Sequence, residues 1–193
     1  VRQALAGHGF APGAVRTLEL GPVRPTWTPR RATLELATEE GWERLVHFAD
    51  ERARDRAMLL VGSDPFAAAE LELVRAEAVD AGADPRGRLV LAEGPPSRVH
   101  GAFVRDTGAA GLVVRWLQDY HRPTEHPDAA QFGYLPAHAA PQVGFSVSSR
   151  IWARLRAATA QGPARLRVSV EVERGRSAAT AVEARIPGRS EER

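Results

Sequence analysis

The sequence contains no cysteine, no lysine and no long apolar run. Without cysteine there is neither a disulfide framework nor a thiolate metal site, and both a secreted and a cytoplasmic location stay possible. The longest apolar stretch, 109–114, is far shorter than the roughly 18 residues that a membrane-spanning helix needs. The hydrophobic fraction of 44% is typical of a globular protein. We therefore expect a globular domain without membrane insertion.

The positive charge of the chain comes from arginine alone. All 26 cationic residues are arginine, and 24 acidic residues reduce the formal net charge to +2. The pI of about 9.8 overstates the positive charge at neutral pH, because guanidinium groups stay protonated to very high pH. The arginines are interleaved with acidic residues, whereas nucleic-acid-binding proteins cluster positive charge on one face. We expect no nucleic-acid partner, and the arginine and alanine usage is typical of a GC-rich bacterial genome.

The first part of the chain combines weak and strong patterns. Residues 2–7 favour a helix that ends at a glycine, and 15–20 favours a weak strand. Three prolines within 21–30 predict a break in regular structure. Apolar and polar residues then alternate over 32–36, which predicts a strand. The apolar residues of 39–56 are spaced for one face of a helix.

The middle of the chain predicts a strand–helix–strand unit. Its helix is expected to begin at an N-cap formed by Ser97 and to end at Gly108. The flanking strands are rich in aliphatic residues, and so short a connection fits a parallel crossover. The strands expected in this region are 58–61, 70–79, 88–92 and 111–116, with a turn over 80–87.

The last part of the chain contains a long loop without periodicity, 117–140, of a kind that often forms a binding surface. The elements expected after it are a strand over 141–146, a helix near 148–160 capped by Ser148 or Ser149, a strand over 165–173, a turn over 174–179 and a strand over 180–186. Together the elements predict an α/β or α+β fold, with a mixed sheet or open barrel of about six or seven strands and two or three flanking helices.

The order of these elements resembles the protease-associated domain family. In that family a glycine and a cation open a strand, as Gly87 and Arg88 do here, and a helix then leads to a Gly-Ala-Ala-Gly turn, found here at 108–111. Small residues at this turn allow the helix end to pack closely over the sheet. The family's second half, in which a proline-led strand delivers a serine to a helix, resembles 141–173. A generic β-α-β unit is the alternative interpretation.

A second stretch, 180–188, is similar to the run through which zinc aminopeptidases and carboxypeptidases return to their catalytic sheet, although the usual asparagine is missing. The resemblance implies that both chain ends are boundaries within a larger protein and that 15–20 lies close to 180–186. The divisions that it implies are the end of a flanking catalytic-domain element at 1–20, a protease-associated-like domain at 21–179 and the start of the return strand at 180–193.

The resemblance implies a non-catalytic accessory domain of a bacterial, zinc-dependent exopeptidase. Such a domain frames substrate access or mediates protein contacts, so its partners would be its own catalytic domain and a peptide or protein substrate. No cofactor is expected within this segment, and zinc is expected in the catalytic domain outside it. The alternative from another class is a stand-alone α/β enzyme or a small-ligand-binding domain that uses the 117–140 loop.

Histidines and acids in the 117–140 loop are the candidates for a metal site. Imidazole and carboxylate groups bind zinc or calcium, which draws attention to His121, His126 and Asp128. However, Pro123 and Pro127 prevent a helical ligand pair, and the sequence has no His-Glu-x-x-His motif. We therefore expect a solvated loop rather than a metal site.

Serines and glycines offer little support for other chemistry. Ser146 follows a strand, but the second glycine of a nucleophile elbow is absent, and helix capping explains Ser148 and Ser149. No glycine-rich phosphate loop is present. We expect no catalytic residue in the chain.

Aromatic residues at the border of the 117–140 loop are the candidates for contact with a substrate or partner. Aromatic side chains outside a core often contribute to recognition. Trp42 and Trp152 are expected in the core instead. The contact candidates are Trp116, Tyr120, Phe132 and Tyr134.

Overall fold

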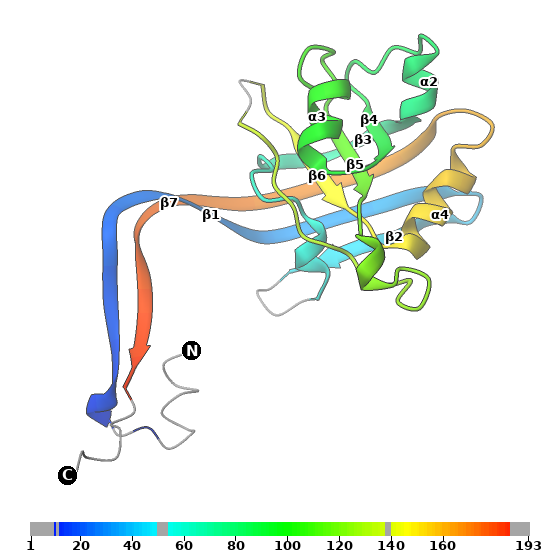
Figure 1. Ribbon diagram of the computed structural model, residues 1–193. Coiled ribbons are helices and arrows are strands. Elements are labelled where there is room, and N and C mark those ends of the chain that lie inside the picture. Colours follow the sequence, from blue (N-terminus) through cyan, green and yellow to red (C-terminus); the bar gives the residue numbers. More distant parts are fainter. Residues whose placement is uncertain (1–9, 11, 50–53, 138–139, 186–193) are drawn as a thin grey trace. The chain divides into compact units, whose positions relative to one another are not determined.

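Seven strands form one mixed sheet in the computed structural model of the chain, which describes residues 10, 12–49, 54–137 and 140–185 (Figure 1). Their order in the sheet is β2-β1-β7-β3-β4-β5-β6, which confirms the predicted mixed α/β class. The strands are β1 Val15–Thr38, β2 Gly41–Phe48, β3 Phe66–Arg75, β4 Leu89–Glu93, β5 Gly111–Arg115, β6 Val143–Ser146 and β7 Ala164–Ala184. The helices in the described part are α2 Ala76–Asp80, α3 Pro96–Phe103 and α4 Ser149–Ala158, with 3₁₀ turns η1 Pro12–Ala14, η2 Arg54–Met58 and η3 Asp119–His121.

The chain divides into two compact units, and each is described by itself. The core unit is Trp27–Glu173, and the ribbon unit combines Val1–Thr26 with Arg174–Arg193. Strands β1 and β7 contribute residues to both units. No helix in the described residues combines the length and apolar character needed to cross a bilayer. The division into catalytic and accessory parts stays a prediction.

Strands β1 and β7 are neighbours in the sheet, and the start of β1 contacts the end of β7. The Arg185 backbone N–H donates to the Ala14 carbonyl at 2.8 Å, and Arg16 forms an ion pair with Glu183 at 2.7 Å. The expected proximity of 15–20 and 180–186 is therefore confirmed for the described residues. The expected helix over 2–7 and the residues from 186 onward lie outside them.

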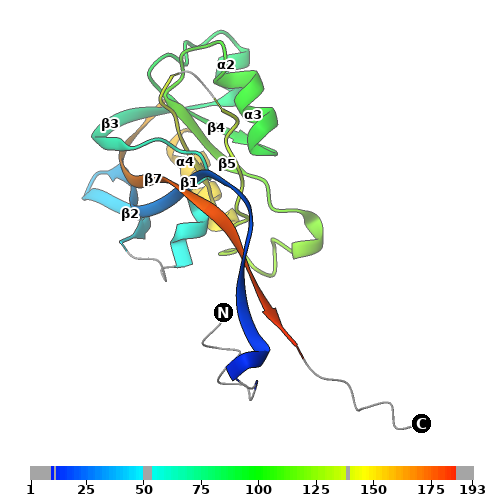
Figure 2. The same cartoon turned by 90° about the vertical axis from the view of Figure 1, so that its left-hand side faces the viewer.

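The predicted strand–helix–strand unit is present as β4, α3 and β5. Strands β4 and β5 pair in parallel from Leu89 opposite Gly111 to Glu93 opposite Arg115. Figure 2 shows α2 and α3 together beside these strands. The N-cap of the helix is Pro95, which offers no side-chain cap, so the cap expected at Ser97 is wrong. Pro96 suits the first helical position because its missing N–H would have no partner in the first helical turn.

Two apolar clusters cover the two faces of the sheet. Val99 of α3 packs with Leu112 and other side chains of one face, whereas Leu155 of α4 packs with Val113 and Phe145 of the other face. Successive strand residues point to opposite faces, so α3 and α4 cover opposite sides. All five side chains are at most 3% exposed. This three-layer arrangement positions the ends of β5 and β6, and with them the loop between the two strands.

A close backbone approach explains the last glycine of the Gly-Ala-Ala-Gly turn. Gly111 opens β5 opposite Val143 of β6, and a Cβ atom at position 111 would lie 1.8 Å from the Val143 carbonyl oxygen. No side chain fits there without moving backbone. The small residue expected at this turn is thus required by the contact between β5 and β6.

The helix predicted over 39–56 is wrong. The structure places strand β2 at 41–48 and η2 at 54–58, and residues 50–53 lie outside the described part. Gly41, with a φ of 127°, allows a tight hairpin after Thr38, and this hairpin brings Val46 opposite Leu34. The apolar spacing of this segment fits both a helix and a strand, and pairing with β1 favours the strand.

Two predicted interruptions are wrong as well, because β1 runs through 21–30 and β7 runs through 174–179. Strand β2 pairs with β1 only from Ala32 onward, so along 21–30 one edge of β1 has no hydrogen bonds to β2. Proline is tolerated on such an edge because no partner requires its N–H. The strand predicted over 70–79 ends at Arg75 and continues as α2. Residues 58–60 are buried, but in place of the strand predicted over 58–61 there are two isolated bridges, from Leu59 to Phe145 of β6 and from Val61 to Tyr134 of the loop.

Candidate functional site

The described part of the 117–140 loop is tied to the core unit at several points. Val61 donates its N–H to the Gly133 carbonyl at 2.9 Å and accepts from the Leu135 N–H at 2.8 Å. The first turn of α4 is a further anchor, because the Arg150 N–H donates to the Pro127 carbonyl at 2.9 Å. The loop therefore presents its side chains from a fixed backbone over 127–135.

Two of the four aromatic candidates lie together on the surface. The rings of Phe132 and Tyr134 meet edge to face with centroids 5.7 Å apart, and the residues are 55% and 62% exposed. Tyr120 is 74% exposed and packs instead against His121, with ring centroids 4.0 Å apart. Trp116 is partly buried against the cluster beneath α3. The exposed pair of Phe132 and Tyr134, called here the aromatic pair, is the strongest apolar contact feature of the loop.

The metal candidates of the loop are not assembled into a site. Asp128 forms an ion pair with Arg150, at 2.7 Å from one carboxylate oxygen, and this pairing raises the pKa of Arg150. His121 lies against Tyr120. Among the residues that the structure describes, no group of three histidines and acids is placed to hold a metal ion. Asp128 instead fixes the loop to α4.

The three candidate serines lie at the end of β6 and the start of α4. The Ser148 hydroxyl accepts a hydrogen bond from the Ile151 N–H at 3.4 Å and caps α4, as predicted for one of the two serines. Ser146 is 1% exposed, and the Oγ atoms of Ser146 and Ser149 are buried without a hydrogen-bond partner.

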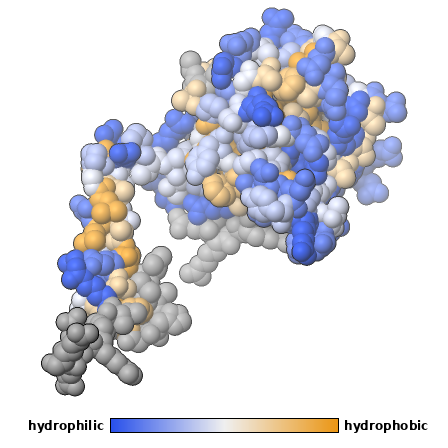
Figure 3. Space-filling model, in the orientation of Figure 1, coloured by the Kyte–Doolittle hydropathy of each residue, from blue (hydrophilic) through white to orange (hydrophobic). Residues whose placement is uncertain are grey.

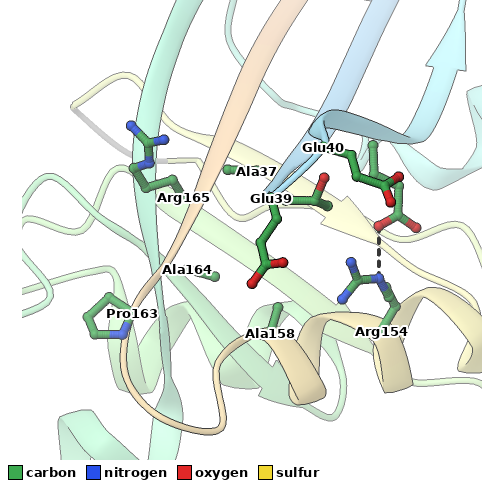
Figure 4. A pocket seen from close by; sticks show the side chains of 10 residues that line it. Ala37, Glu39, Glu40, Arg154, Ala158, Pro163, Ala164 and Arg165 are labelled. Carbon is green, nitrogen blue, oxygen red and sulfur yellow. Dashed lines mark hydrogen bonds and ion pairs between the residues drawn. The ribbon is translucent and has the colours of Figure 1, made fainter.

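A hollow of about 830 Å³ lies between the β1–β2 hairpin, α4 and the start of β7 (Figure 4). Glu43 on its wall pairs with Arg154 at 2.8 Å. Glu39 and Glu40 form no ion pair within the described residues, and Figure 4 shows Glu39 extending from the hairpin toward Ala158. Arg154 and Arg165 line the hollow as well, so its wall carries charges of both signs. The sequence did not predict this hollow because the apolar spacing of 39–56 fits a helix. In the structure, Glu39 and Glu40 lie instead in the turn of the β1–β2 hairpin.

Comparisons with known proteins give matches in structure only. No protein-family model matches the sequence, and no curated protein matches it either. A peptidase M28 precursor from Shewanella amazonensis SB2B superposes with a TM-score of 0.63 at 15% identity, over 94% of this chain and 42% of that chain. An aminopeptidase from Aneurinibacillus sp. strain AM-1 superposes with a TM-score of 0.51 at 18% identity, over 94% of this chain and 39% of that chain.

A third structure, a zinc aminopeptidase from Bacillus subtilis, has a TM-score of 0.49 at 14% identity and covers 84% of this chain and 34% of that chain. The chain spans about two fifths of the length of the first two proteins. At these identities the likeness concerns the fold. The chain thus has a fold that also occurs within an M28 peptidase precursor and an aminopeptidase.

Proposed function

We propose that this chain is a non-catalytic accessory domain, of the protease-associated type, of a zinc-dependent exopeptidase. The observation that carries the proposal is the path of the backbone. The core unit is entered through β1 and left through β7, and these strands are neighbours. A domain whose two ends lie side by side can be inserted into another domain without disturbing its fold. The partial coverage of the two peptidase structures is compatible with such an insertion.

The proposal places the zinc chemistry in the catalytic domain of the parent protein. The chain contributes surface instead, and its substrate is a peptide or protein held by that catalytic domain. The aromatic pair would contact apolar side chains of the substrate or of a partner. Tyr120 and Trp116 stay candidates for the same contact, Tyr120 as an exposed ring and Trp116 at the edge of the core.

Assays of this chain without a catalytic domain test the proposal. The chain by itself is expected to hydrolyse no aminoacyl chromogenic substrate and to bind no stoichiometric zinc in metal analysis. Turnover by the isolated chain together with stoichiometric zinc would overturn the accessory role and favour a stand-alone enzyme.

A deletion in the parent protein tests the framing of substrate access. Gly175 lies close enough to Thr26 that a Cβ atom on it would be 3.1 Å from the Thr26 hydroxyl, so 27–173 can be replaced by a short Asn-Gly turn. We expect hydrolysis of a small chromogenic substrate to survive, while its ratio to the hydrolysis of longer peptides changes about tenfold, ~1.4 kcal/mol in relative barrier. An unchanged ratio contradicts the framing role.

The contact proposed for the aromatic pair has its own test. In the parent protein, Phe132→Ala and Tyr134→Ala are expected to raise KM for peptides with apolar side chains and to leave kcat for a small substrate unchanged. Glu125→Ala is the matched control, since this residue is exposed in the same loop and lies outside the pair. Equal effects of all three variants contradict a contact through the aromatic rings.

A further inference from the structure

Three buried polar atoms, one just after β5, one in the loop between β5 and β6 and one at the end of β6, have no hydrogen-bond partner among the described atoms. They are Nε1 of Trp116, Oε1 of Gln131 and Oγ of Ser146. Buried polar groups in folded proteins are almost always hydrogen-bonded to protein or to ordered water. The described protein atoms do not supply these bonds, so the three atoms call for a common physical explanation.

The pleat of the sheet places Ser146 and Trp116 on the same face. Ser146 pairs laterally with Val114, and Val114 belongs to the cluster under α3. Trp116 packs against this cluster too. Alternation along β6 puts Gly144 on the same face, and a Cβ atom there would touch Leu135. The serine hydroxyl and the indole therefore both face the side of the sheet that Gly133 and Leu135 cover.

The segment that carries Gln131 is held over this face. A Cβ atom on Gly133 would lie 3.5 Å from Nε1 of Trp116, so the segment passes directly beside the indole nitrogen. The segment is bonded to Val61 on one side of Gln131 and to Arg150 on the other. Gln131 thus lies in an anchored span, two residues before the position that passes Trp116.

We propose that this place is an internal hydration site, in which a buried water joins Trp116, Gln131 and Ser146. The chemistry of the three atoms is complementary to one water molecule. An indole N–H only donates, an amide oxygen only accepts, and a hydroxyl does either. A water that accepts from Trp116, donates to Gln131 and shares its third bond with Ser146 makes the roughly three hydrogen bonds usual for a buried water. Such a water fixes the segment that presents the aromatic pair.

Nuclear magnetic resonance of the full chain with ¹⁵N-labelled tryptophan tests the site. The indole proton of Trp116, identified by its loss in Trp116→Phe, is expected to show a cross-peak to water with the sign of a molecule that tumbles with the protein. Trp27 is the internal control, because its Nε1 donates directly to the Ser63 carbonyl at 2.8 Å. Absence of the Trp116 cross-peak overturns the proposal.

Variants show whether the three atoms share one water. Ser146→Ala and Gln131→Leu each remove one bond and are expected to reduce the Trp116 cross-peak by more than half, with faster exchange of the indole proton. Ser149→Ala is the matched control, since its hydroxyl is also buried and unpartnered but lies in the first turn of α4. A cross-peak that persists unchanged in folded Ser146→Ala and Gln131→Leu, or that is lost only in Ser149→Ala, overturns the shared site.

Discussion

The two ends of strand β1 differ sharply in burial. In the core unit, Ala32, Leu34 and Leu36 are fully buried, whereas Leu20 and Val23 in the ribbon unit are 52% and 51% exposed. Figure 3 shows hydrophobic residues gathered on the strands of the ribbon unit. A strand buries its apolar side chains only where a second layer covers them. The core unit supplies this layer through α4, whose Leu155 belongs to the same cluster, and the ribbon unit has no such layer within the described residues.

The ribbon unit is held by its backbone ladder and by surface ion pairs. Glu183 accepts hydrogen bonds from Arg16 and Arg185, and Arg176 donates to the Val23 carbonyl at 3.4 Å. A two-stranded ribbon is marginally stable in water by itself. In the accessory role proposed above, a neighbouring domain would cover the exposed Leu20 and Val23.

The largest expected effect comes from truncating one leucine of β1 in each unit. Leu34→Ala is expected to lower the free energy of unfolding by about 2–5 kcal/mol, because it leaves a cavity in the core unit. Leu20→Ala, at an exposed site of the same strand, is expected to change it by less than about 0.5 kcal/mol. Urea denaturation followed by circular dichroism measures both. Similar losses for the two variants would mean that the ribbon unit has a core of its own.

Close backbone packing is a second difference between the units. Gly111→Ala puts a Cβ atom against the Val143 carbonyl and is expected to lower the free energy of unfolding by about 3 kcal/mol or more, since β5 and β6 must separate. Gly13→Ala is the counterpart in the ribbon unit, where a Cβ atom meets nothing within 4 Å, and its effect is expected within about 0.5 kcal/mol. Thermal unfolding compares them. A well-folded Gly111→Ala protein of normal stability contradicts the β5–β6 contact.

A smaller effect is expected at the start of α4. Ser148→Ala removes the helix cap and is expected to lower the free energy of unfolding by about 1 kcal/mol. Ser149→Ala is expected to be neutral or stabilising, because its buried hydroxyl has no partner to lose. Denaturant titration of both variants distinguishes the cap from its neighbour, and the reverse order would assign the cap to Ser149.

Local patterns predicted the fold where the spacing of apolar residues fits one kind of element only. The aliphatic runs of β4 and β5, the serine cap of α4 and the alternation in the first half of β7 follow from such patterns. The hairpin at 39–40 was missed because the apolar spacing of 39–56 fits both a helix and a strand. Only the contact between β2 and β1 decides between them, and the apolar spacing within one segment does not show which segment it pairs with.

The candidate site was predictable in its residue types but not in its arrangement. Exposed aromatics in an aperiodic loop pointed to Phe132 and Tyr134, which lie in contact. The separation of Tyr120 from this pair and the use of Asp128 as an anchor for α4 depend on how the loop folds over the sheet. The hydration site joins an aperiodic loop to two strand ends, so no periodic pattern contains it.

Acid is expected to loosen the ribbon unit before the core unit. A hydrogen bond from Arg16 and, to a smaller extent, one from Arg185 lower the pKa of Glu183 below its usual 4.5. A carboxyl with a lowered folded-state pKa adds stability that is complete above its unfolded pKa and is lost as the pH falls through the folded value. Amide hydrogen exchange is therefore expected to accelerate in 15–26 and 174–184 as the pH drops below about 4.5, after correction for intrinsic exchange rates. Glu183→Gln is expected to remove this dependence while 27–173 stays protected, and equal loosening of both units would contradict the difference between them.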